Sequence, residues 1–165
     1  MSETRQYDVI IIGAGIIGAN LAFEMSKAGY RTLNVDKLPA AGYGSTANSC
    51  AIVRTHYSTW AGVAMAYEGF HFWKEWDDYL GITDERGNAG FVQCGGVFIG
   101  DDSRYEDKVL PLFDEIGIDY ERWDVDELTG RLPGVDTGEH TPPKRPEDDA
   151  FWEDPPKQIT SAVHT

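Results

Sequence analysis

The start of the chain carries the pattern that most restricts its fold. The apolar run YDVIII at residues 7–12 has the continuous hydrophobicity of a β-strand buried on both faces. It stops at GAGIIG, residues 13–18, after which residues 19–27 place apolar side chains at helical intervals. A second strand is predicted over residues 30–35 and ends at Asp36. Strand, glycine turn, helix and strand in this order predict a Rossmann-like α/β fold.

Each glycine of the turn has its own steric reason. Gly13 permits the tight turn, Gly15 lets backbone N–H groups approach a pyrophosphate, and Gly18 lets the helix pack on the strand. An acid such as Asp36, about 20 residues further on, accepts hydrogen bonds from the hydroxyls of an adenosine ribose. Glycines also gather in ordinary turns, but here the flanking strands, helix and acid are all present. The pattern predicts dinucleotide binding, and the charge of Asp36 disfavours NADP.

The glycine pattern leaves NAD and FAD open. An NAD-binding domain usually continues into another crossover helix, whereas residues 38–48, LPAAGYGSTAN, form a loop rich in glycine, serine and alanine. Such a loop can follow an extended cofactor with its backbone, which favours FAD. An NAD-dependent dehydrogenase is the alternative, in which this loop has no role.

Arg54 directly follows the apolar residues Ala51, Ile52 and Val53. A guanidinium keeps its charge at physiological pH, so an arginine drawn inward needs an anion or several hydrogen bonds. The anion is either the carboxylate of a ligand or a protein acid such as Glu68 on the following helix.

Four segments resemble a known family, the amine- and amino-acid-oxidising flavoproteins related to D-amino-acid oxidase. Residues 7–37 are similar to the family's FAD fingerprint, and GSTANSCAIVRTHY at 44–57 to its flavin loop with a trailing arginine. FVQCGGVFIG at 91–100 and DVDELTGRLPG at 124–134 are similar to later elements. The sarcosine oxidase and dimethylglycine dehydrogenase branch matches best.

This resemblance implies a glutathione-reductase-like FAD-binding fold with the start of a mixed-sheet substrate domain. It implies oxidation of the C–N bond of a small N-methylated or secondary amino acid. It also assigns positions: Gly13, Gly15, Ile16, Ile17 and Gly18 at the pyrophosphate, Asp36 and Lys37 at the adenosine ribose, Gly44, Ser45 and Thr46 beside pyrophosphate and flavin, and Ala51 and Ile52 along the isoalloxazine. Arg54 matches the arginine that holds the substrate carboxylate.

Members of this family are much longer than 165 residues, so a truncated chain is expected. The implied domains are the N-terminal half of the FAD-binding domain at 1–85, the beginning of the substrate domain at 86–140, and a proline- and acid-rich loop at 141–165. A non-catalytic FAD-binding fragment, or a subunit of a heteromeric oxidase, is the alternative to an enzyme.

The charge and the cysteine content of the chain limit which binding partners and which cellular compartment are expected. Lys and Arg number 14 against 28 Asp and Glu, giving a net charge of −14 that repels nucleic acids and anionic membranes. The longest apolar run is too short to span a membrane, and the polar first ten residues do not begin a signal peptide. Cys50 and Cys94 lack the spacing of a metal-binding motif, so no metal site is expected. Both are predicted to be small buried residues. With so few cysteines, the expected location is the cytoplasm.

The middle of the chain is predicted to form helices and strands with structural roles. Residues 60–80 are predicted as one amphipathic helix whose aromatic residues form part of the core. His56 and His71 have no visible acidic partner in the sequence, which indicates structural roles for both histidines. The remaining predictions are two short strands around Cys94–Gly96, a helix over 104–116, a strand over 120–123 and a helix over 125–131 capped by Asp124.

Overall fold

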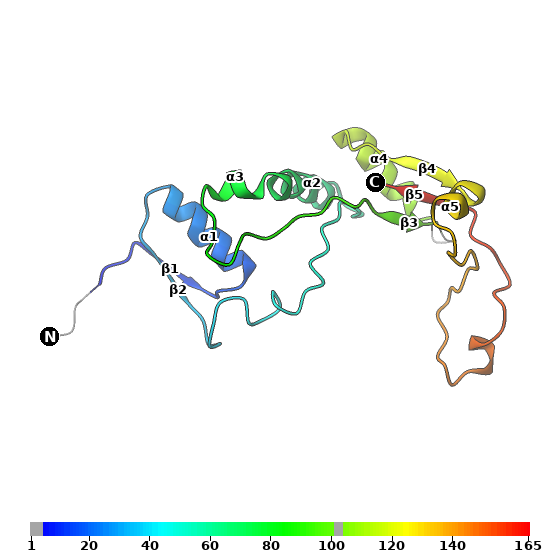
Figure 1. The fold of residues 1–165 in the computed structure, drawn as a ribbon, viewed down its shortest axis with the longest axis horizontal. Coiled ribbons are helices and arrows are strands. Elements are labelled where there is room, and N and C mark those ends of the chain that lie inside the picture. Colours follow the sequence, from blue (N-terminus) through cyan, green and yellow to red (C-terminus); the bar gives the residue numbers. More distant parts are fainter. Residues whose placement is uncertain (1–4, 101–103) are drawn as a thin grey trace. The chain divides into compact units, whose positions relative to one another are not determined.

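The computed structural model describes residues 5–100 and 104–165. It forms two compact units, Met1–Ile52 and Val53–Thr165, each described by itself below (Figure 1). The boundary between the two compact units lies at residue 52. Residues 60–80 fall in the second unit because the helix there packs on a later helix of that unit.

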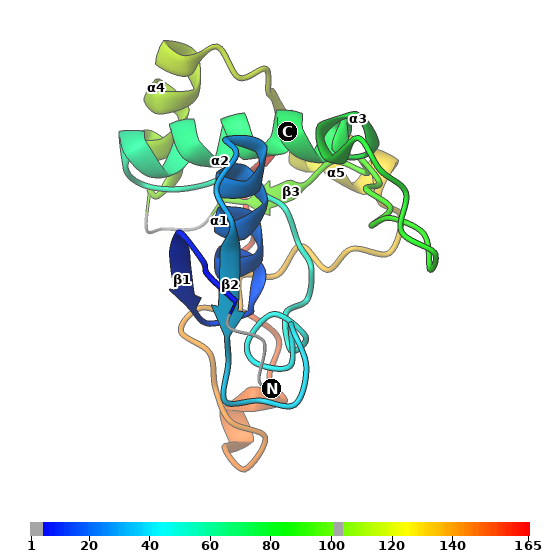
Figure 2. The same cartoon turned by 90° about the vertical axis from the view of Figure 1, so that its left-hand side faces the viewer.

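The first unit has the predicted order of strand, helix and strand. These elements are β1 (Val9–Ile12), α1 (Ile16–Lys27) and β2 (Thr32–Val35). The two strands pair in parallel, with Val9 opposite Thr32 and Ile12 opposite Val35. Figure 2 shows them side by side with α1 along them. An ion pair at 3.1 Å between Asp8 Oδ2 and Arg31 Nε joins the starts of the two strands.

The prediction that the first strand is buried on both faces is wrong for this unit. Only Ile11 is buried, whereas the side chains of Ile10 and Ile12 are 64% and 92% exposed. Within the described residues of this unit the sheet has two strands. A parallel sheet needs further strands, with helices on both faces, to cover such side chains. The continuous hydrophobicity of β1 therefore exceeds what this unit can bury.

The second unit is built on an antiparallel sheet of three strands. Its elements are α2 (Trp60–Lys74), α3 (Trp76–Leu80), β3 (Val97–Ile99), α4 (Glu106–Ile116), β4 (Glu121–Asp124), α5 (Val125–Arg131), η1 (Asp149–Phe151) and β5 (Ser161–His164). The strand order is β3-β5-β4, so the last strand of the chain lies in the middle. Val163 of β5 is opposite Phe98 on one side and Arg122 on the other.

Neighbouring residues of β5 belong to two different clusters. Val163 packs with a buried cluster on α2 and α4: Val63, Val109, Leu110, Phe113 and Ile118. Ala162 packs with Trp123, Leu128 and Ile159. Because successive side chains of a strand point to opposite faces, the sheet carries α4 on one face and α5 on the other. This arrangement explains why the alternating residues of so short a strand are all partly or fully buried.

Several predicted elements of the second unit are confirmed. Helix α4 ends at Gly117, whose φ of 83° is the left-handed conformation that glycine adopts readily. Helix α5 spans the predicted 125–131, and its cap Asp124 accepts a hydrogen bond of 2.8 Å from the Glu127 N–H. Strand β4 lies within one residue of its predicted bounds.

Other predictions for this unit are wrong. Residues 60–80 form two helices that break at Glu75, although the sequence has no helix breaker there. Residues 91–93 form no strand, and β3 pairs with β5 instead of a hairpin partner. The predicted loop at 141–165 includes β5, because the pairing that makes it a strand comes from distant segments. Cys50 and Cys94 are exposed, not buried, and both lie in segments outside the helices and strands.

A helix that crosses a bilayer needs about 20 predominantly apolar residues. No helix within the described residues is both long and apolar enough to cross a bilayer.

Candidate functional site

The three glycines of the turn between β1 and α1 differ in what an added side chain would meet. Gly13 has a φ of 111°, in the region that favours glycine. A Cβ added to Gly18 would run into the carbonyl oxygen of Gly13, and one added to Gly15 would lie 3.1 Å from Thr46 Oγ1. The turn therefore favours glycine at Gly13 through its backbone conformation and requires it at Gly18 through close packing, while a Cβ at Gly15 would press on the Thr46 hydroxyl.

Asp36, at the end of β2, is tied to the glycine turn. Its Oδ2 accepts a hydrogen bond of 2.8 Å from the Ala14 N–H, and its Oδ1 accepts one of 2.9 Å from the Leu38 N–H. The Leu38 bond, then the Ala14 bond, hold the pKa of the Asp36 carboxyl below its usual range. Each carboxylate oxygen has a second lone pair, so the group can still accept from a ribose hydroxyl.

Sequence reasoning missed Asn34. Its Nδ2 donates to the carbonyl oxygens of Gly13, at 3.2 Å, and Gly18, at 3.1 Å. The side chain thus fastens the first and last glycines of the turn to β2. The sequence did contain an indication of this role. In the strand TLNV, Asn34 is a polar residue between the apolar residues Leu33 and Val35.

The glycine-rich loop after β2 docks on the same turn. Thr46 Oγ1 accepts a hydrogen bond of 2.9 Å from the Ile16 N–H, and the Gly42 N–H donates to the Ala14 carbonyl at 2.8 Å. No acidic residue occupies the first turn of α1, so the helix N-terminus carries no charge that would repel a phosphate. Glycine turn, helix N-terminus, Asp36 and docked loop together fit a dinucleotide such as FAD.

The other predicted cofactor residues of the first unit are mostly exposed. Ile17 and Ile52 are large apolar side chains left exposed, and Lys37 and Ser45 are exposed in the loop. The Gly44 carbonyl accepts a hydrogen bond of 2.9 Å from Asn48 Nδ2. Ala51 has a φ of 53°, which is uncommon for a residue with a Cβ.

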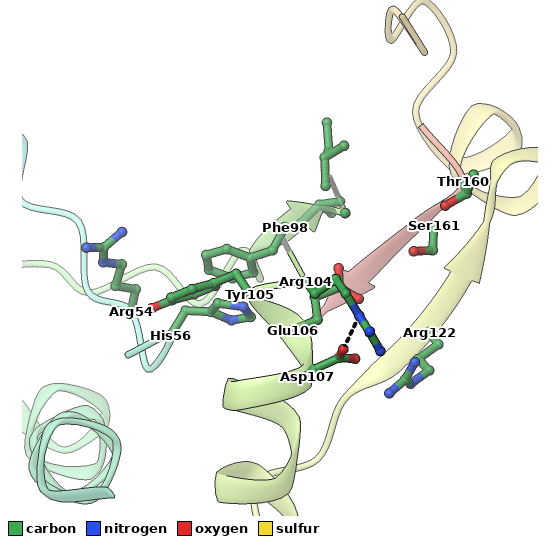
Figure 3. Close-up of a pocket in the computed structure, with 13 residues that line it drawn as sticks. Arg54, His56, Phe98, Arg104, Tyr105, Glu106, Asp107, Arg122, Thr160 and Ser161 are labelled. Carbon is green, nitrogen blue, oxygen red and sulfur yellow. Dashed lines mark ion pairs between the residues drawn. The ribbon is translucent and has the colours of Figure 1, made fainter. Parts of the chain in front are cut away.

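A cleft of about 720 Å³ lies in the second unit. Figure 3 shows side chains around it from the segment before α2, strand β3, the N-terminal end of α4, and strands β4 and β5. Its lining includes three arginines, two aromatic rings and two hydroxyls, which are Arg54, Arg104, Arg122, Phe98, Tyr105, Thr160 and Ser161. These residues are far apart in the sequence, so only Arg54 could be singled out in advance.

The arginines of the cleft differ in their partners. Arg104 Nε is 2.6 Å from Asp107 Oδ2 (Figure 3). Arg54 has no acidic partner within the described residues, and the structure shows no pair with Glu68; its guanidinium lies over the Tyr57 ring at 5.2 Å. Arg122 likewise has no ion pair within the described residues. Arg54 and Arg122 are thus the arginines of the cleft without an ion pair within the described residues, although the carboxylates of Glu106 and Asp107 also line the cleft.

His56 is the buried polar residue of this cleft. Its side chain is only 3% exposed, and its ring stacks on Phe98 with 3.5 Å between centroids and meets Phe113 edge-on at 5.3 Å. Burial, and secondly the charge of Arg54, lower the pKa of His56 to about 4, so its ring is neutral at pH 7. Neither ring nitrogen has a hydrogen-bond partner among the described residues.

Comparison with known proteins decides the family. The sequence model of the family described as FAD dependent oxidoreductase matches residues 8–145. The chain belongs to this FAD-dependent oxidoreductase family. The match settles the choice between NAD and FAD that the glycine pattern left open.

Curated relatives of this FAD-dependent family include two named monomeric sarcosine oxidase. The protein from Arthrobacter sp. (strain TE1826) is 27% identical over 144 residues, covering 85% of this chain and 36% of the relative. The protein from Bacillus sp. (strain B-0618) is 25% identical over 141 residues, covering 83% and 35%. The chain therefore spans about a third of the length of these relatives.

Solved structures of low identity share the fold. L-proline dehydrogenase from P. horikoshii aligns with a TM-score of 0.72 at 19% identity, covering 99% of this chain and 37% of that one. L-amino acid deaminase from Proteus vulgaris aligns with a TM-score of 0.67 at 19% identity, covering 100% and 35%. Both share the mixed α/β fold of this chain.

Proposed function

We propose that this chain contributes to an enzyme that oxidises the C–N bond of a small N-methylated or secondary amino acid, such as sarcosine or dimethylglycine. Bound FAD supplies the hydride acceptor for this chemistry. Arg54 carries the proposal, because it presents a guanidinium at a cleft without an acidic partner among the described residues. The names of the two sarcosine oxidase relatives support the same substrate class.

The first unit would hold the cofactor. In this proposal the pyrophosphate lies at Gly13, Gly15 and the N-terminus of α1, and Asp36 accepts from the adenosine ribose. Lys37, Gly44, Ser45, Ala51 and Ile52 are proposed cofactor contacts on the family resemblance. A glutathione-reductase-like FAD domain, the division into FAD-binding and substrate domains, and a cytoplasmic location stay predictions.

Replacing Asp36 with alanine should weaken FAD binding about tenfold or more, because the ribose loses a charged acceptor. Since Asp36 also ties the glycine turn through Ala14, the ribose contact must be separated from the turn. FAD and a 2′-deoxyadenosine analogue of FAD should therefore be titrated into both proteins. The wild type should prefer FAD, and Asp36→Ala should bind the two dinucleotides equally. An unchanged preference in the variant would assign Asp36 to the turn alone.

Replacing Arg54 with lysine should lower kcat/KM for amino-acid substrates about tenfold, or about 1.4 kcal/mol, mainly by raising KM. A guanidinium binds a carboxylate through two parallel hydrogen bonds and fixes its angle, whereas an ammonium fixes only its distance. FAD content should not change. Arg86→Lys is the matched control, because Arg86 lies in a loop outside the cleft. If Arg54→Lys loses stability but retains normal kinetics, Arg54 is structural and the substrate class loses its main support.

The second candidate is a non-catalytic FAD-binding subunit of a heteromeric oxidase, in which the glycine turn and Asp36 of the first unit would hold the cofactor. Anaerobic addition of sarcosine or proline distinguishes the two. An enzyme bleaches its yellow flavin on mixing, and a non-catalytic subunit that holds FAD stays yellow.

A further inference from the structure

Tyr57 lies against Arg54 and is not part of the cleft lining. The guanidinium carbon of Arg54 is 5.2 Å from the centroid of the Tyr57 ring, over its face. Arg54 lines the cleft, whereas Tyr57 does not. The Tyr57 hydroxyl makes no hydrogen bond among the described residues. The face of the ring is therefore the part of Tyr57 that interacts with the guanidinium.

An aromatic face holds an arginine differently from a carboxylate. Arg104 shows the other arrangement, because its Nε is 2.6 Å from Asp107 Oδ2. A carboxylate that accepts from a guanidinium occupies N–H donors and neutralises the charge that an anionic ligand needs. A ring attracts the cation through its quadrupole and offers no carboxylate oxygen to the N–H donors. Arg54 thus has a partner that restrains it without competing with a ligand carboxylate.

The start of α2 fixes the position of Tyr57. Thr59 caps this helix by accepting a hydrogen bond of 3.3 Å from the Gly62 N–H. A Cβ added to Gly62 would lie 2.9 Å from Thr59 Oγ1 and 3.1 Å from Tyr57 Cβ. Glycine at position 62 therefore permits the close approach of Tyr57 to the first turn of the helix. These contacts connect the N-terminus of α2 to Tyr57 and, through its ring, to Arg54.

We propose that Tyr57 is a positioning residue that holds the Arg54 guanidinium ready for the substrate carboxylate. This inference rests on the proposed function, because it takes Arg54 as the carboxylate site. Arg54 is exposed, so without the ring its long side chain would sample many rotamers, and ligand binding would cost the entropy of ordering it. The ring restricts the side chain before the ligand arrives. Its contribution is therefore to carboxylate affinity and not to the chemical step.

Butyrate carries a carboxylate but no oxidisable amine, so calorimetry of the FAD-loaded protein measures its affinity without turnover. Tyr57→Leu should weaken butyrate binding and raise KM for sarcosine about threefold or more. Its kcat, FAD content and melting temperature should not change. Tyr57→Phe retains the ring and should have wild-type affinity and KM, because the hydroxyl it removes has no partner among the described residues.

A second substitution moves the ring without removing it. Gly62→Ala places a methyl group against Tyr57 and should raise KM in the same direction as Tyr57→Leu. Because both substitutions act through one contact, the double variant should show less than the product of the two effects. Gly69→Ala is the matched control in the same helix, since a Cβ there meets no atom within 4 Å.

The outcomes separate this inference from the proposed function. If Arg54→Lys weakens butyrate binding but Tyr57→Leu does not, the positioning role is wrong and the carboxylate site stands. If neither substitution weakens it, or the wild type binds no butyrate, the inference and the Arg54 assignment both fail. A loss in Tyr57→Phe as large as in Tyr57→Leu would assign the effect to the hydroxyl and overturn the ring contact. A lower kcat and melting temperature in Tyr57→Leu with unchanged KM would make Tyr57 structural and also overturn it.

Discussion

Replacing Gly18 with alanine should destabilise the first unit by about 3 kcal/mol and remove bound FAD, because the new Cβ collides with backbone. The Cβ would run into the Gly13 carbonyl oxygen and lie 3.0 Å from the Gly13 carbonyl carbon. Neither atom can rotate away as a side chain can. Helix α1 would have to move off β1, and the contact that Asn34 makes to Gly13 and Gly18 would be lost. Urea unfolding and the flavin absorbance of purified protein measure the two effects.

Gly69→Ala provides the control for this substitution. Gly69 also lies inside a helix, α2, but a Cβ added there meets no atom within 4 Å. Alanine should stabilise that helix by up to about 1 kcal/mol, because glycine is the poorer helix former. If Gly18→Ala retained wild-type stability and full FAD content, the close packing of helix on strand would not be what the glycine turn requires.

Acidification should destabilise the second unit through His56 by as much as about 3 kcal/mol, at about 1.4 kcal/mol per pKa unit. The pKa of His56 is lowered from 6.5 to about 4 in the folded protein. Well above pH 6.5 the ring is neutral in both states and contributes no pH dependence to stability. Below it the unfolded state binds a proton that the folded state does not, so stability falls until about pH 4 and then levels off.

His56→Phe isolates this contribution from that of the carboxylates. Asp8, Asp36, Glu121 and Asp136 have lowered pKa values, so their stabilisation is present above their unfolded pKa and is lost mainly below pH 4. Unfolding free energies at pH 7 and pH 4.5 should therefore differ by more in the wild type than in His56→Phe. Equal differences in the two proteins would show that His56 titrates normally and is not desolvated.

The order of elements around the glycine turn was predictable because its causes are local. A strand, three glycines, a helix and a terminal acid each have steric or electrostatic reasons within a short segment, and the structure has them in that order. The burial of β1 was not predictable, because it depends on strands that the sequence pattern presupposes and this unit does not contain. Asn34 was missed because a single polar residue in a strand indicates a partner without identifying it.

The second unit was less predictable because its contacts are non-local. Strand β5 has only two apolar residues that are fully buried, Ala162 and Val163, and it follows a segment rich in proline and acids. Its two neighbours, β3 and β4, are encoded far upstream. The same holds for the cleft: the sequence indicated Arg54, but it could not show that Arg122 and Phe98 lie on the same sheet face or that His56 is buried without partners.

The central place of β5 has a consequence for synthesis on the ribosome. Strands β3 and β4 do not touch each other in the sheet, and each pairs only with β5. Until residues 161–164 have left the exit tunnel, both strands have unpaired edges, and the cluster around Val163 lacks its central residue. Helices α2 and α4 can meet earlier, but the sheet itself forms only after translation of this segment. During that interval the nascent chain exposes the strand edges that chaperones and neighbouring chains recognise.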